Sequence, residues 1–168
     1  MIDYRQGNKI IMIQLVSWIN TVGKTTLTDD EIYEASKFML AAIHDYKNAT
    51  LFMTRLSMHS LTSAALYRTI KQCYLELYPN GKEDESKIET AIVSFGIKAS
   101  SKISSIQDDT IIQSIIYRCI SLFSKKSDAT IFCSAMKSNV KDDFHKYIDM
   151  YLNDYRYMVK PLPGYYIH

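Results

Sequence analysis

The chain has 168 residues, of which 47% are hydrophobic and 23% charged, and its formal net charge is +2. These values are typical of a globular domain and exclude both a disordered tail and a strongly basic arm for binding polyanions. Only five glycines and three prolines occur, which disfavours the turn-rich all-β sandwiches and barrels. We therefore expect one helical domain over residues 1–168.

The first predicted element is a short amphipathic helix over residues 10–22. The segment Gly23-Lys24-Thr25 that follows is similar to the end of a phosphate-binding loop. That loop requires a glycine at position 18, where this chain has Trp18, and a buried strand in front of it. We therefore expect a plain interhelical turn here and no nucleotide site.

Apolar residues at helical spacing predict three further helices, over residues 28–47, 50–59 and 62–78. Thr28 and Glu31 form a capping box at the start of the first, because the hydroxyl can accept from the Glu31 amide while the carboxylate reaches back. A proline and a glycine after Tyr78 end the third helix.

A second capping box, Ser86 with Glu89, predicts a helix that continues to Ile103. Asp108 and Asp109 are then expected to cap the most apolar segment of the chain.

That segment, Thr110–Phe123, is hydrophobic on most sides, which predicts a central helix enclosed by the others. We expect five of its side chains to be nearly fully buried: Ile112, Ile115, Ile116, Cys119 and Ile120. Ser127-Asp128 and Asp142-Asp143 are expected to cap the last two helices. Residues 160–168 would form an extended tail. The predicted fold is an all-α bundle of about seven or eight helices.

No residue pattern indicates catalysis. The four histidines and three cysteines lack zinc-ligand spacing, and no nucleophilic-serine motif occurs. The paired carboxylates fall at predicted helix starts or in loops, where they favour the helix dipole. We therefore expect no enzyme, no metal and no cofactor.

The cysteines, Cys73, Cys119 and Cys133, are expected to be small buried hydrophobes in a reducing compartment. No signal-peptide cleavage site follows the first apolar run, and that run of 14 uncharged residues is shorter than the ~20 needed to span a bilayer. We therefore expect an intracellular, cytoplasmic protein without a membrane span.

Two predicted helices are hydrophobic over a wider stripe than one core contact requires, so part of each should face a partner. Met and Tyr suit such a surface, since one repacks easily and the other orders at low entropic cost. The partner would be another protein or a second copy of the chain. The candidate interaction residues are Leu51, Phe52, Met53, Leu56 and Met58 in the first helix, and Tyr147, Tyr151 and Tyr155 in the second.

The last helix also allows an alternative function. Its tyrosines stand beside Lys146 and Arg156, and aromatic side chains with basic neighbours can stack nucleic-acid bases. The alternative is a small helical nucleic-acid-binding or nucleoprotein-assembly subunit.

Four segments carry a resemblance to a known family. They are Ser17-Trp18-Ile19-Asn20, Leu66-Tyr67-Arg68 with Leu77-Tyr78-Pro79-Asn80-Gly81, Asp108-Asp109 with Ile116-Tyr117-Arg118-Cys119-Ile120, and the last helix Asp142–Tyr157. In this order they resemble the small poxviral Bcl-like proteins, which are single all-α domains around one apolar helix. The use of Ile, Tyr, Lys and Ser suits an AT-rich viral genome.

The resemblance implies a non-enzymatic protein–protein interaction module, a viral modulator of host apoptosis or innate immune signalling. Such a module would bind a host protein through a groove or a helical face. The Asn-Trp-Gly-Arg quartet of the cellular family members is absent from this chain, which puts binding of their death ligands in doubt.

Overall fold

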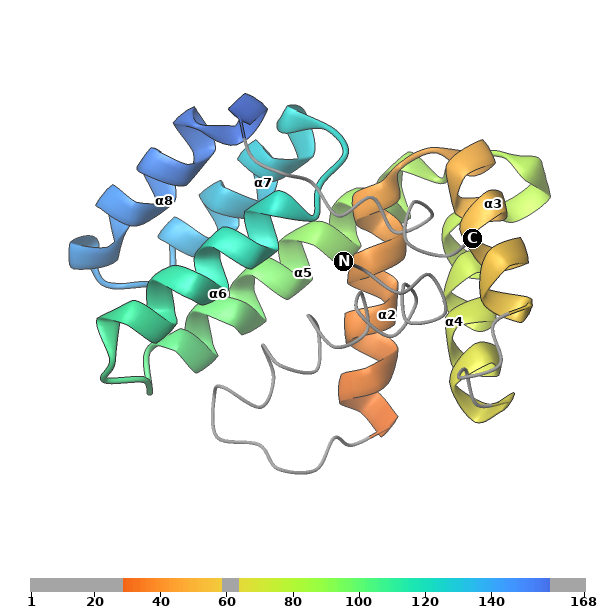
Figure 1. Ribbon diagram of the computed structural model, residues 1–168, viewed down its shortest axis with the longest axis horizontal. Helices are drawn as coiled ribbons and strands as arrows, with labels where there is room; N and C mark the ends of the chain where they lie inside the picture. Colours follow the sequence, from red (N-terminus) through yellow and green to blue (C-terminus); the bar gives the residue numbers. More distant parts are fainter. Residues whose placement is uncertain (1–28, 59–63, 158–168) are drawn as a thin grey trace, which may run out of the picture.

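The computed structural model describes residues 29–58 and 64–157, and every regular element in these ranges is helical. The α-helices are α2 (Asp29–Ile43), α3 (Tyr46–Ser57), α4 (Ala64–Leu77), α5 (Glu85–Ile103), α6 (Asp109–Ser121), α7 (Lys126–Lys137) and α8 (His145–Asn153) (Figure 1). Short 3-10 turns occupy Pro79–Gly81, Asp142–Phe144 and Tyr155–Tyr157. The all-α prediction is confirmed. The expectations for residues 10–25, Thr28 and the tail 160–168 lie outside the described residues.

Helix α5 runs across the molecule and joins its two ends (Figure 1). At one end α3 and α4 form an antiparallel pair, and α2 packs against both α4 and α5. At the other end α7 packs along α5, and α8 packs against α6 and α7.

The most enclosed helix is α2 and not the predicted 110–123 segment. Six consecutive residues of α2, Phe38 to Ile43, are at most 3% exposed. Helix α6 buries one stripe, which contains all five of the predicted side chains, while Ser114, Tyr117 and Arg118 share an exposed face. The polar residues of α6 thus fall together on one side. The alanines of α2 let neighbouring helices approach it from several sides.

Several helix boundaries differ from the sequence-based prediction. Helix α2 ends at Ile43, because His44 adopts a left-handed φ of 45°, and α3 already begins at Tyr46. The cap of α5 is Asp84 and not Ser86, since Asp84 Oδ1 accepts from the Lys87 amide at 3.1 Å.

Of the three predicted aspartate caps, one is confirmed. Asp108 Oδ1 accepts from the amide of Thr110 at 2.9 Å. Helix α7 begins at Lys126 without a side-chain cap, and the Asp128 carboxylate is used elsewhere. Asp142 and Asp143 lie in a 3-10 turn that precedes α8.

His44 connects three helices at the junction of α2 and α3. Its Nδ1 lies 2.7 Å from Asp128 Oδ2 of α7, and its Nε2 lies 2.5 Å from Glu85 Oε2 of α5. The Asp128 side chain is only 4% exposed, whereas that of Glu85 is 72% exposed. Because a buried carboxylate without a partner is costly, the contact with Asp128 carries most of the stabilisation.

Gly96 allows α5 and α7 to approach closely. A Cβ atom at this position would lie 3.0 Å from Ala135 Cβ and 3.1 Å from the Phe132 carbonyl oxygen. Backbone atoms cannot move aside as a flexible side-chain end can, so a glycine is needed for this helix contact.

The hydroxyl of Ser36 on α2 is buried and has no hydrogen-bond partner within the part of the chain that the structure describes. By contrast, the hydroxyl of Ser100 on α5, which is equally buried, donates to the Ile97 carbonyl at 2.7 Å. The two serines can therefore be compared, since both are buried but only the Ser100 hydroxyl has a hydrogen-bond partner among the described residues.

His44→Asn should lower the free energy of unfolding by roughly 3–5 kcal/mol, because Asn tolerates the left-handed backbone but leaves Asp128 unpaired. Glu85→Gln should cost less than about 1 kcal/mol, since that carboxylate is exposed. Urea unfolding measures both. Equal losses for the two variants would contradict the assignment of the stabilisation to Asp128.

Gly96→Ala should lower the free energy of unfolding by about 1–3 kcal/mol through steric overlap with α7, although alanine favours helix by ~1 kcal/mol. Ser101→Ala, on the exposed side of the same helix, is the control and should be neutral or slightly stabilising. Thermal melts followed by circular dichroism compare the two. A stabilised Gly96→Ala variant would rule out the close approach.

Ser36→Ala should leave stability unchanged or raise it by about 1 kcal/mol, because it removes a buried hydroxyl that has no partner. Ser100→Ala should instead cost about 0.5–1.5 kcal/mol for its lost hydrogen bond. The midpoints of chemical denaturation should therefore move in different directions. A clear loss in Ser36→Ala would show that this hydroxyl is hydrogen-bonded.

Candidate functional site

The outer face of the α3–α4 pair exposes apolar side chains. Thr50 Oγ1 and Tyr74 OH lie 2.7 Å apart across the pair. Each residue of a helix is rotated by about 100° about the helix axis relative to the residue before it. Because α3 and α4 are antiparallel, this rotation carries the residues that follow Thr50 and Tyr74 to the same side of the pair. Leu51 and Leu75, which are 43% and 56% exposed, therefore share one face.

Met58 lies two turns after Leu51 on this same side of α3 and is 80% exposed. Of the other residues predicted for this surface, Phe52, Met53 and Leu56 are buried in the core. The wide hydrophobic stripe of α3 is thus divided between core and solvent, as its width indicated.

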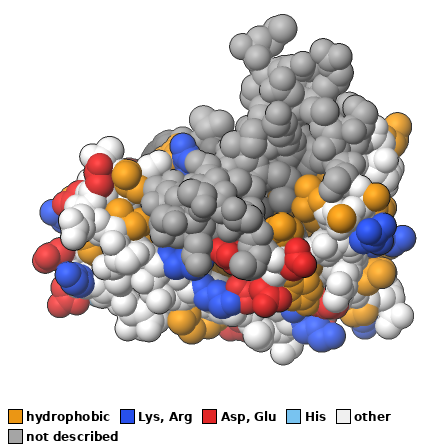
Figure 2. Space-filling model, turned by 90° about the horizontal axis from the view of Figure 1, so that it is seen from below, with side chains coloured by type: hydrophobic (Ala, Val, Ile, Leu, Met, Phe, Trp, Pro, Cys, Tyr) orange, Lys and Arg blue, Asp and Glu red, His pale blue; other side chains and the backbone are white. Residues whose placement is uncertain are grey.

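The same face is positively charged. Helical spacing places Arg55 beside Leu51 and Met58 on α3, and places Arg68 and Lys71 in one stripe with Leu75 on α4. Helix α3 contains no acidic residue. The one acidic residue of α4, Glu76, is turned towards α2, where it bonds to Tyr33 and Lys37. At this end of the molecule hydrophobic side chains lie beside lysine and arginine (Figure 2). We call the six residues Leu51, Arg55, Met58, Arg68, Lys71 and Leu75 the α3–α4 face.

The tyrosines near α8 that were predicted to face a partner mostly pack against other residues of the chain. Tyr155 is buried, and its hydroxyl donates to the Phe123 carbonyl at 2.5 Å; burial raises its pKa to about 12. Tyr151 packs edge-on against Tyr117 of α6, and Tyr147 is half-buried with Lys146 over its ring. These residues contribute less free surface than α3 and α4.

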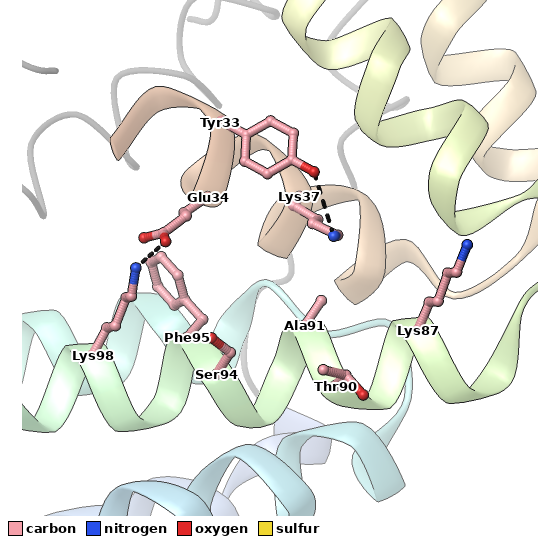
Figure 3. A pocket seen from close by; sticks show the side chains of 9 residues that line it. All are labelled: Tyr33, Glu34, Lys37, Lys87, Thr90, Ala91, Ser94, Phe95 and Lys98. Atoms are coloured by element: carbon pink, nitrogen blue, oxygen red, sulfur yellow. Dashed lines mark hydrogen bonds and ion pairs between the residues drawn. The ribbon is translucent and has the colours of Figure 1, made fainter. Parts of the chain in front are cut away.

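A groove of about 230 Å³ lies between α2 and α5. Its α5 side is a stripe at helical spacing, and its α2 side is one turn of helix (Figure 3). The lining residues are Tyr33, Glu34, Lys37, Lys87, Thr90, Ala91, Ser94, Phe95 and Lys98. This groove could not be predicted from the sequence, because the α5 stripe alone resembles an ordinary solvated face and only the crossing of α2 makes it concave.

The lysines of the groove differ in their surroundings. Lys98 pairs with Glu34, and Lys37 lies 3.3 Å from Glu76 Oε2. Burial opposes the charge on Lys37, but its hydrogen bonds to Glu76 and Tyr33 raise its pKa overall. Lys87 forms no ion pair within the described part of the chain.

The described residues offer little nucleophilic or metal-binding chemistry. Cys73, Cys119 and Cys133 are all buried, and burial raises the pKa of Cys73 and Cys133 to about 12 each and that of Cys119 still further. No group of three or more His, Cys, Asp or Glu side chains among them could hold a metal ion.

No family model matches the chain, and neither the comparison with curated proteins nor that with solved structures gave a match. None of the described helices is long and apolar enough to cross a membrane.

Proposed function

We propose that this protein is a non-enzymatic protein–protein interaction module that binds a partner through the α3–α4 face. The observation that carries the proposal is the joint exposure of Leu51, Met58 and Leu75 among cations. Exposed apolar side chains grouped beside charged ones are typical of interaction sites.

The partner surface would be apolar and acidic, because the face has three apolar side chains and three cations. A second copy of the chain is less favoured as the partner, since a two-fold interface would bring the cations of both copies together. The resemblance to the small poxviral Bcl-like proteins extends the proposal to a cytoplasmic viral modulator that binds a host protein of apoptosis or innate signalling.

A nucleic-acid-binding role is the alternative function. Lys146 and Arg156 beside the tyrosines of the last helix would contact phosphates, but single-strand binding also uses free aromatic faces for stacking. The ring of Tyr155 is buried and that of Tyr151 packs against Tyr117, which favours the protein-binding function.

A photo-crosslinking residue placed at position 51 or 75 tests the proposal in the cells that make the protein. We expect adducts with a specific protein from these two positions and none from position 114, an exposed position on α6. Adducts with the chain itself would indicate a homodimer. Equal labelling from all three positions would contradict a dedicated face.

Leu75→Asp should abolish the adduct formed from position 51, because it places an anion in an apolar interface facing an acidic partner. A central interface residue contributes more than ~1 kcal/mol to binding, while an exposed substitution changes folding stability by only about 0.5 kcal/mol. Unchanged labelling in a folded Leu75→Asp variant would rule out the α3–α4 face.

Retention on a polyanion column separates the two functions. Nucleic-acid binding would give retention that falls steeply with salt and is lost on Lys146→Glu, because phosphate contacts release counterions. The proposed protein module should show weak retention that this variant changes little.

A further inference from the structure

The groove between α2 and α5 is separate from the α3–α4 face, since neither α3 nor α4 contributes a lining residue. We propose that it binds an extended acidic segment of a partner protein. This inference goes beyond the proposed function and does not depend on the α3–α4 face.

Two lysines of α5 and one of α2 line the groove. Lys87 and Lys98 stand at the two ends of the groove, and Lys37 of α2 lies between them (Figure 3). The two α5 lysines are about 16 Å apart along the helix axis, at roughly 1.5 Å rise per residue. About five residues of extended chain span the same length, and because side chains alternate between the two faces of an extended chain, the first and last residues of a seven-residue segment point to one face. A segment with carboxylates at both ends therefore matches the spacing of the cations.

The surface between the lysines is partly apolar. Ala91 is half-buried on the α5 side, with the buried Phe95 beside it, and the open groove has room for one or two side chains. The ring of Phe95 is stacked on Phe38 at 4.1 Å between centroids, so this part of the α5 side is held rigidly by the core. A small apolar side chain between the two carboxylates would pack against Ala91.

Lys87 and Lys98 can each bind a carboxylate of a ligand. Lys87 forms no ion pair within the residues that the structure describes. The pair between Lys98 and Glu34 is half-exposed, and such pairs contribute little to stability. An ammonium group has three N–H donors, so Lys98 can bind a second carboxylate without losing Glu34.

Nucleic acid fits this groove less well than an acidic peptide. Glu34 lines the groove and Glu76 lies beside it on Lys37, so a backbone with a phosphate at every nucleotide would meet both carboxylates, whereas a segment that is acidic only at its two ends meets Glu34 alone. One face of Tyr33 is covered by Lys37, and Phe95 is stacked on Phe38. No aromatic residue that lines the groove therefore offers both ring faces to a base.

The test uses the full chain, labelled with ¹⁵N, and a pool of heptapeptides with glutamate at both ends and Ala, Val, Leu or Phe between them. We expect saturable shifts of the Thr90, Ala91 and Ser94 amide signals. A pool with glutamine at both ends should bind at least tenfold more weakly, because charge-assisted contacts are lost.

Lys87→Glu should weaken binding of the glutamate-ended pool at least tenfold. This variant should fold normally, because position 87 lies in the first turn of α5, where an anion favours the helix dipole. Lys141→Glu, at an exposed site before α8, is the charge-matched control and should bind as the unaltered chain does. Leu75→Asp should also bind the pool normally, so failure of the α3–α4 face and failure of the groove can be told apart.

Three results would overturn the inference. The first is the absence of saturable shifts at millimolar peptide. The second is equal binding of the two pools or of the Lys87→Glu variant. The third is stronger binding of an oligothymidylate at the same amides, which would assign the groove to nucleic acid.

Discussion

Helix α2 is enclosed by the helices around it, and its contacts position them. The ring of Phe38 stacks on Phe95 of α5 and meets Phe123 edge-on, with a further contact to Phe132 of α7. On another side the buried Tyr78 hydroxyl, which follows α4, donates to the Leu40 carbonyl at 2.6 Å. One helix thus fixes the positions of both ends of the molecule. The α2–α5 groove and the orientation of the α3–α4 pair are both consequences of this packing.

The two surfaces are basic although the chain as a whole is nearly neutral, with a net charge of +2. Three acidic residues pair with side chains outside their own helix: Glu76 holds Lys37 and Tyr33, Glu34 holds Lys98 at the surface, and Asp128 is buried against His44. Lysines and arginines on α3, α4 and the start of α5 are left at the surface. Two separate sites with a preference for acidic partners would let the protein hold one partner at two points, and such bivalency raises affinity without new contacts. The uneven distribution of charge, and not its sum, is therefore the property that a partner would recognise.

Some local signals in the sequence were read correctly and others were not. Asp108 caps α6 because an aspartate before an apolar run can satisfy the first amides of a helix. The prediction that Ser86 caps α5 was wrong. The cap is Asp84, two residues earlier in the chain, whose carboxylate accepts from the Lys87 amide, and the local pattern was compatible with either residue as the cap. Asp128 resembled a cap in the sequence, yet its carboxylate binds His44, which is distant in the chain. The end of α2 before His44 also has no local signal in the sequence, since the apolar periodicity of the helix continues through His44.

The all-α class, most of the helices and the buried stripe of 110–123 could be predicted from the sequence, because hydrophobic periodicity and capping act over a few residues. The sequence also indicated that α3 carries more hydrophobic surface than a core contact needs. Which helix is enclosed depends on tertiary packing, since a helix is central because of what packs around it and not because of its own composition. Tertiary packing also decides that Leu51 and Met58, but not Phe52 or Leu56, reach solvent. The groove lined by Lys87 and Lys98 exists only because α2 crosses α5, and no pattern within either helix encodes that crossing.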